Sequence, residues 1–364
     1  MRLNTAVAVT ASLVLFALTG CSVAAPAAAP TPSASPAPAP EASDPLRCDD
    51  LVPDDLVAAA LQGSDGIAIE PVAAAKHSDV FDAVLLEGAG GLPCSWRVGG
   101  GMPEYNAPSD WAYLRVDVLP GAAAGWVPVQ LGDAPSDHTR EIAGVEASVA
   151  GGDPGWVISA PIGDNWVTAS ISAAALTSTG SRFAGLGADV MIDRLAEVAE
   201  AAFTALQQAT PDRLDWPIVE LRQTEAICNG GLDEQGIVAA LQLPAGAAVE
   251  YSVRNPSIEA PTSFAAAVGA AARTFTCELQ ADDGTWLTIT TARGFSPLFD
   301  RLREPDADVA LGPLELADAP ADTKAVVTGT GRASTVYLSI GGTVYGIHGE
   351  GAPAVAQAIV AQIF

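Results

Sequence analysis

Apolar residues recur at two spacings along the chain, and these spacings indicate strands and helices. Several short stretches alternate apolar and polar residues, which is typical of a strand with one buried face. In the first half we expect strands at residues 67–72, 94–98 and 111–118, and a triplet of strands over 145–172 that includes 155–162 and 166–172. In the second half we expect strands at 249–253, 274–279 and 286–291, and a triplet over 324–348 that includes 335–340 and 343–347. Asp283-Gly284, between two of these stretches, predicts a tight hairpin turn.

Other stretches follow the helical period. Each half is expected to open with a short helix, to carry a second helix around Phe81 or Phe264, and to close on an Ala-rich helix. The apolar faces expected for the two closing helices are Ile192, Leu195, Ala199, Ala202 and Leu206, and Val355, Ile359 and Ile363. Mostly antiparallel strands covered by helices define an α+β fold.

The two halves repeat one pattern. A cysteine precedes a helical leucine by 13 residues in each half, and a phenylalanine precedes a second cysteine by the same spacing. These pairs are Cys48 and Leu61, Cys228 and Leu241, Phe81 and Cys94, and Phe264 and Cys277. Because the order of the expected elements is also shared, the sequence predicts two tandem copies of one α+β domain, at residues 46–210 and 217–364.

Four of the five cysteines fall inside these copies, which is an even number suited to an oxidising compartment. Four cysteines allow three pairings, and composition does not choose among them. The repeat does, because equivalent residues should pair in equivalent ways. We therefore expect one disulfide in each copy, Cys48–Cys94 and Cys228–Cys277.

The N-terminal segment predicts export. Arg2 precedes an apolar run, Ala6 to Leu18, whose 13 residues would span roughly 20 Å as a helix, too short for a bilayer core of about 30 Å. Residues 1–20 are thus expected to be a signal peptide. Leu18-Thr19-Gly20-Cys21 resembles the lipobox of bacterial lipoproteins, which implies lipidation of Cys21.

Residues 21–45 follow the signal and are dominated by Ala, Pro, Ser and Thr. Such a segment has no apolar face to bury and is expected to act as an extended tether. With the lipidated Cys21, it would hold both domains outside the cytoplasmic membrane, anchored by lipid.

Charge excludes some partners. The chain has 17 basic and 43 acidic residues, a formal charge of −26 at pH 7. Nucleic acid and anionic lipid headgroups attract proteins through basic patches, so neither is expected as an electrostatic partner.

Three motifs of copy one look like those of actinobacterial secreted envelope lipoproteins of unknown function. They are Cys-x-x-Leu at Cys48 and Leu51, an Ala-rich helix ending at Ala60-Leu61, and Cys-x-Trp at Cys94 and Trp96. The resemblance implies a secreted, disulfide-bonded α+β module and no reaction. Copy two departs from it, because its leucine comes one residue later, at Leu232, and Leu279 replaces the tryptophan.

Motifs for chemistry are scarce. The sequence contains no phosphate-binding loop, dinucleotide fingerprint, nucleophile elbow or zinc-ligand spacing, and no cofactor is expected. Ser136-Asp137-His138 has the residue types of a catalytic triad, but triad residues normally come from separate segments, so a polar loop is the favoured interpretation. The acidic pairs Asp49-Asp50 and Asp54-Asp55 lack calcium-loop spacing and are expected at the N-termini of helices.

Copy one has two long loops where copy two has short connections, and long loops on a rigid scaffold often carry binding. The first spans residues 99–110 and the second 173–188. The candidate binding residues in them are Gly99, Gly100, Gly101, Met102, Tyr105, Ser178, Arg182 and Phe183. The favoured interpretation is nevertheless that these loops carry no function and that the five tryptophans of copy one belong to its core.

The favoured function is a non-catalytic binding or interaction module of the cell envelope, with a protein, glycan or lipid as its partner. The two copies share cysteine, glycine and apolar residues, whereas a duplicated enzyme would be expected to keep an acid, base or nucleophile. The first alternative is a carrier of an apolar ligand or lipid, which a preformed cavity would favour. The second alternative is a hydrolase.

Overall fold

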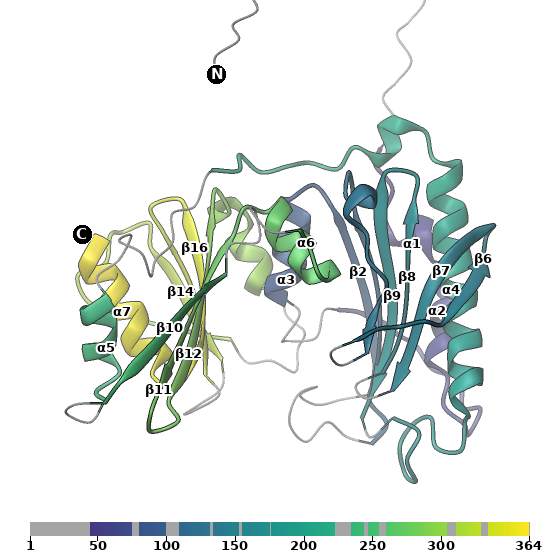
Figure 1. The fold of residues 1–364 in the computed structure, drawn as a ribbon, viewed down its shortest axis with the longest axis horizontal. Coiled ribbons are helices and arrows are strands. Elements are labelled where there is room, and N and C mark those ends of the chain that lie inside the picture. The colour runs from purple at the N-terminus through teal and green to yellow at the C-terminus, as the bar shows by residue number, and fades with distance from the viewer. Residues whose placement is uncertain are drawn as a thin grey trace, which may run out of the picture. The chain divides into compact units, whose positions relative to one another are not determined.

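The protein forms two seven-stranded antiparallel sheets, one from each half of the sequence (Figure 1). The computed structural model describes residues 44–74, 80–99, 109–131, 134–152, 155–174, 176–222, 234–243, 247–254, 260–303, 311–328 and 334–363. Residues from Ser43 onward cluster as one compact unit.

The first sheet consists of β1 (Val72–Ala73), β2 (Leu92–Val98), β3 (Ala112–Leu119), β6 (Thr139–Ile142), β7 (Val145–Gly152), β8 (Gly155–Ile162) and β9 (Asn165–Ala173). The second consists of β10 (Val249–Arg254), β11 (Phe275–Ala281), β12 (Trp286–Arg293), β13 (Gly312–Pro313), β14 (Lys324–Thr328), β15 (Thr335–Ile340) and β16 (Thr343–Gly349). A separate hairpin pairs β4 (Gln130–Leu131) with β5 (Ala134–Pro135).

The two sheets have the same strand order. The first runs β1-β2-β3-β9-β8-β7-β6 and the second β10-β11-β12-β16-β15-β14-β13. The register agrees as well, because Cys94 lies opposite Val116 and Cys277 lies opposite Ile289. An identical order of seven strands supports the duplication, and it assigns an equivalent residue in copy two to each residue of the central strands.

Helices cover one face of each sheet. In copy one these are α1 (Cys48–Leu51), α2 (Asp54–Leu61) and the long α4 (Ala188–Gln208). In copy two they are α5 (Glu234–Ala240) and α7 (Ala352–Ile363). The expected face of α4 is buried, with Ile192 only partly so. In α7, Val355 and Ile359 are buried, but Ile363 lies in the last turn and is 36% exposed, so the prediction for Ile363 is wrong.

A third cluster of buried residues contains side chains from both copies. It includes α3 (Val80–Gly88), α6 (Phe264–Ala271) and the 3-10 helix η5 (Ser296–Arg303), together with residues of both sheets. Phe81 of α3 stacks on Tyr337 of the second sheet, with ring centroids 5.6 Å apart. Reciprocally, Phe264 of α6 meets the edge of Trp166 in the first sheet at 5.7 Å. Each copy therefore contributes a helix that packs on the sheet of the other.

The turns follow the sequence closely. Asp283-Gly284 joins β11 to β12, and Gly284 has a φ of +85°, a conformation that glycine adopts without strain. Among the strands that were expected, the first of copy one differs: it pairs only at Val72 and Ala73 in place of residues 67–72. The backbone N–H of Ile67 donates to Asp65 Oδ1 at 3.0 Å, so this segment begins in a local side-chain turn, and Ile67 remains 65% exposed.

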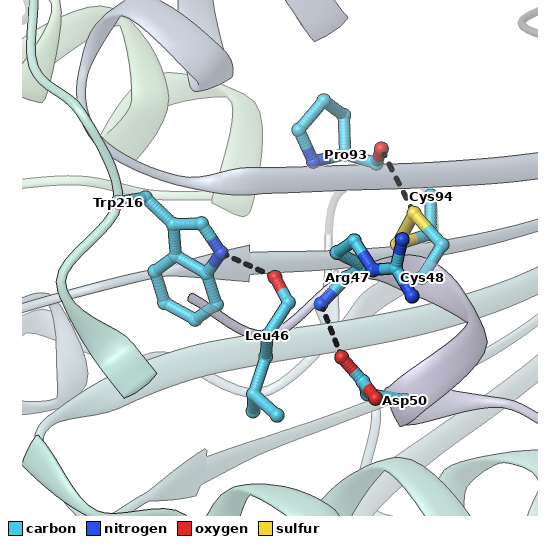
Figure 2. Close-up of a disulfide and its surroundings, with 7 residues drawn as sticks. All are labelled: Leu46, Arg47, Cys48, Asp50, Pro93, Cys94 and Trp216. Atoms are coloured by element: carbon cyan, nitrogen blue, oxygen red, sulfur yellow. Dashed lines mark hydrogen bonds between the residues drawn. A yellow bond between two sulfur atoms is a disulfide. The ribbon is translucent and has the colours of Figure 1, made fainter. Parts of the chain in front are cut away.

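The disulfide of copy one joins the start of α1 to β2 (Figure 2). Cys48 and Cys94 are bonded, with Cα atoms 5.4 Å apart, so the pairing expected from the repeat is confirmed in this copy. Beside it, the Trp216 indole N–H donates to the Leu46 carbonyl at 2.8 Å, which fixes the segment between the copies against copy one. Cys277 is buried in β11 at the position equivalent to Cys94, and Cys228 lies outside the described residues.

Candidate functional site: a cleft lined by both copies

The described residues form a cleft of about 750 Å³. Its walls come from β3, β8 and β9 of the first sheet, from β10, β11 and β12 of the second, and from α3 and α6. Seven hydroxyl side chains line it: Thr168, Ser170, Thr262, Ser263, Thr274, Thr276 and Thr290. Two arginines and three carboxylates also line it, which leaves a formal charge of −1.

The wall from copy one carries an ion pair. Arg115 and Asp117 are two positions apart on β3 and therefore point to the same side, away from the core-facing Leu114, Val116 and Val118. Arg115 Nε lies 2.5 Å from Asp117 Oδ2, and the two side chains are only 17% and 3% exposed. Taking such a pair out of water is costly, so its position in a cleft is a feature that hydrophobic packing does not explain.

The wall from copy two is more open to solvent. Arg254 on β10 pairs with Glu278 on β11 at 3.1 Å, with side chains 73% and 37% exposed. The Ser252 hydroxyl donates to the same carboxylate at 3.2 Å. Thr276 and Thr290 share a hydrogen bond of 3.1 Å between their hydroxyls. This wall therefore presents charged and hydroxyl groups that neighbouring strands hold in place.

Helix α6 closes one side of the cleft. Ser263 caps its first turn, accepting a hydrogen bond of 3.2 Å from the Ala266 N–H. Thr262, Ser263 and Phe264 line the cleft from this end, and Phe81 lines it from α3. Because Phe81 and Phe264 each pack on the opposite sheet, the helices that border the cleft are fixed by the same contacts that join the copies.

The structure describes only part of the predicted binding loops, and none of their described residues lines the cleft. Gly99 follows β2 with a φ of +77°, whereas Gly100, Gly101, Met102 and Tyr105 lie outside the described residues.

In the second loop Ser178 is exposed, and Arg182 is tied down by donating from Nε to the Asp110 carbonyl at 2.8 Å. Phe183 is fully buried and meets the edge of Trp156 at 6.1 Å, so it anchors the loop to the core and does not reach solvent. Four of the five tryptophans of copy one are buried as well: Trp96, Trp111, Trp156 and Trp166.

The described histidines are not arranged as a catalytic triad. The Ser136 hydroxyl donates to the Val149 carbonyl at 2.6 Å, while the Asp137 and His138 side chains are 95% and 78% exposed. His348 Nδ1 lies 2.7 Å from the Thr335 hydroxyl, and its ring meets Trp286. His77 lies outside the described residues.

The acidic residues near the start of copy one have structural roles. Asp50 Oδ2 accepts a hydrogen bond of 2.9 Å from the Arg47 N–H and pairs with Arg213 at 3.0 Å, and Asp54 and Asp55 lie in the first turn of α2. Within the described ranges, no group of three or more His, Cys, Asp or Glu side chains is placed to hold a metal ion.

The cleft is not predicted from the sequence, although one pattern in the sequence indicates part of its wall. Residues 114–118 alternate Leu, Arg, Val, Asp and Val, which places two charges on one face of a strand whose other face is buried. The pattern marks a polar face, but only the contact between the two copies turns that face into the wall of a cleft.

Comparison of the chain with known protein families, with curated proteins and with solved structures finds no match. None of the helices in the described ranges combines the length and apolar composition needed to cross a bilayer. Cys21, the expected lipidation site, lies outside those ranges.

Proposed function

We propose that the protein is a non-catalytic binding protein of the cell envelope, held at the outer surface of the cytoplasmic membrane by lipid on Cys21. The cleft between the copies is its ligand site. The observation that carries the proposal is a cavity of about 750 Å³ with a nearly buried ion pair, Arg115 and Asp117, in its wall. Known ligand sites have volumes of about 300–1,000 Å³ and use a few fixed polar groups to orient the ligand.

The composition of the wall favours a polar ligand. A purely apolar ligand would have to displace water from two ion pairs and several hydroxyls without replacing their hydrogen bonds, which is unfavourable. A ligand with its own donors and acceptors replaces those bonds. The cleft therefore supports a binding protein for a polar molecule better than a carrier of hydrocarbon chains.

Native mass spectrometry of the detergent-purified lipoprotein tests this proposal. The protein is first incubated with the low-molecular-mass fraction of an envelope extract. We expect the wild type to carry a ligand, and Ser170→Trp, which fills the cleft from β9, to lose it. A fatty-acyl mass would favour the apolar carrier, and a hydrolysed product would favour the hydrolase.

The matched control is Ser178→Trp, which adds the same side chain to the exposed loop of copy one. If this variant loses the ligand and Ser170→Trp keeps it, the loop of copy one is the binding site and the cleft is not. Both variants are first compared with the wild type by thermal melting, so that lost binding is not mistaken for lost folding.

The anchor is tested separately. Because Cys21 is the cysteine at the expected cleavage site, Cys21→Ala should release the protein from the membrane fraction or leave its signal peptide uncleaved. Cell fractionation and the mass of the intact protein measure both outcomes. Normal membrane retention of a processed variant would contradict the lipid anchor.

A further inference from the structure

The polar face of the second sheet continues beyond the cleft. Alternate residues of a strand lie on the same face of the sheet, and so do residues that are paired directly across two antiparallel strands. Thr290, which lines the cleft, is therefore on the same face as Thr288 and Trp286 of β12. His348 lies opposite Thr288, and Gln280 lies opposite Trp286, so both belong to this face as well. The row of hydrogen-bonding side chains thus leads from the cleft to an indole ring.

Trp286 is 42% exposed, although its ring is held in place. The centroid of the Trp286 ring lies 5.0 Å from that of His348 with an angle of 62° between the planes, and the Thr335 hydroxyl in turn fixes His348. The equivalent residue of copy one, Tyr113, is 2% exposed. Of these two equivalent residues, the one in copy two presents an ordered aromatic ring to solvent at the end of its polar row.

The charges near this row are compensated. Arg254 pairs with Glu278, and Arg115 pairs with Asp117 two positions along β3. Both arginines among the described residues of the cleft walls are thus paired with carboxylates, and the chain as a whole is strongly acidic, so these groups do not favour an anion. A neutral ligand rich in both donors and acceptors fits these groups, and an aromatic ring adds a contact for its C–H surfaces. Sugars combine these two properties.

We infer that the ligand is a neutral glycan chain, and that Trp286 packs against a sugar ring outside the cleft. This inference rests on the proposed function, because it takes the cleft as the binding site. The four residue steps from Thr290 to Trp286 span about 13 Å along the strand. A ligand that reaches from the cleft to Trp286 therefore contains several sugar units. Its affinity rises with the length of the glycan chain until the chain reaches Trp286.

The test uses the full lipoprotein in detergent micelles and size-graded neutral oligosaccharides of N-acetylglucosamine, glucose, mannose and xylose as probes. Calorimetric titration should find at least one series in which longer members bind more tightly. Trp286→Ala should weaken binding of the longest member about tenfold and leave the shortest unchanged. Trp286→Tyr should restore most of the affinity. Ile67→Ala, at another exposed apolar residue, is the matched control and should change nothing.

The outcomes separate this inference from the proposed function. If no oligosaccharide series binds while Ser170→Trp still loses a non-carbohydrate ligand, the glycan inference is overturned and the cleft remains the binding site. If binding occurs but shows no dependence on Trp286 in normally melting variants, the extension beyond the cleft is wrong. If Ser170→Trp leaves both oligosaccharide binding and the extract ligand unchanged, the proposed function fails together with the inference.

Discussion

At the centre of each sheet, the two copies differ on one face and agree on the other. The core-facing residues Val116 of β3 and Ile289 of β12 are both fully buried. On the cleft-facing side, Asp117 of copy one has Thr290 as its equivalent in copy two. The apolar face is constrained by packing against the covering helices, whereas the polar face is free to diverge. The face on which the two copies differ is the one that lines the proposed ligand site.

The helices α3 and α6, unlike the polar faces of the sheets, have kept the same feature in both copies. Both carry a phenylalanine 13 residues before a cysteine, and both insert it against the other copy. The two copies thus share the phenylalanine that packs each copy on the other. The contacts that hold the copies together are alike in both, whereas the polar residues that line the cleft differ.

Separating the copies should have the largest effect. Residues 44–216 or 217–364, expressed alone, would expose apolar surface that the third cluster buries, including the fully buried Leu86, Phe295 and Phe299. We expect neither half to give a cooperative thermal transition as a monomer, as measured by circular dichroism and size-exclusion chromatography. Co-expression of the two halves should restore folding. A monomeric half with a sharp transition would show that the copies are independent domains.

Removing the disulfide of copy one comes next. Cys48 and Cys94 are 46 residues apart, and closing such a loop stabilises a protein by about 4 kcal/mol in the chain-entropy model. The double variant Cys48→Ser, Cys94→Ser should lose a free energy of unfolding of this order in urea titrations.

The equivalent disulfide is expected in copy two. Peptide mapping without reductant should find Cys228 joined to Cys277. Two free thiols at these positions would mean that the two copies differ in their disulfides.

A smaller effect is expected at Ser159, whose hydroxyl accepts hydrogen bonds from two indole N–H groups, Trp126 at 3.1 Å and Trp166 at 2.9 Å. Its equivalent in copy two is Tyr337, which stacks on Phe81 in place of this arrangement. Ser159→Ala leaves the buried Trp166 donor without its acceptor and should cost about 1–3 kcal/mol. Thr168→Ala, directly across the strand ladder, should cost less. Equal losses in urea titrations would mean that the shared hydroxyl has no special role.

The smallest effect concerns pH. Burial raises the pKa of the Tyr345 phenol, and the Arg293 charge and a hydrogen bond with Thr343 partly oppose this rise. The folded protein therefore binds this proton more tightly than the unfolded chain, and stability falls once the pH exceeds about 10, the ordinary pKa of tyrosine. Tyr345→Phe should make the free energy of unfolding decline less steeply above that pH. Tyr251→Phe, at an exposed edge strand, should leave the decline unchanged.

Much of the fold could be predicted from the sequence, because local signals determine it. The strands at 155–162 and 335–340 begin and end as expected, since each is followed at once by a Gly-containing turn. The first disulfide followed from the repeat. The strand at 67–72 was wrong because Asp65 starts a competing turn, which alternation does not reveal.

The cleft could not be predicted in the same way. Arg115 and Asp117 are visible in the sequence as charges in an apolar strand, but their partners across the cleft, such as Thr276 and Thr290, are more than 150 residues away. No periodicity connects positions so distant, because their proximity depends on how two finished sheets pack through α3 and α6. Phe183 illustrates the converse, since a loop residue that looked available for binding is a core residue.

The fusion of two copies into one chain has a consequence for how the cleft can change. In a symmetric homodimer each substitution appears on both sides of the interface, so two walls cannot be altered independently. Here the wall bearing Asp117 and the wall bearing Thr290 are encoded by separate codons. If the cleft binds the proposed ligand, a substitution can modify recognition on one wall while the other wall keeps its contacts with that ligand. Covalent linkage thus allows specificity to change in single steps.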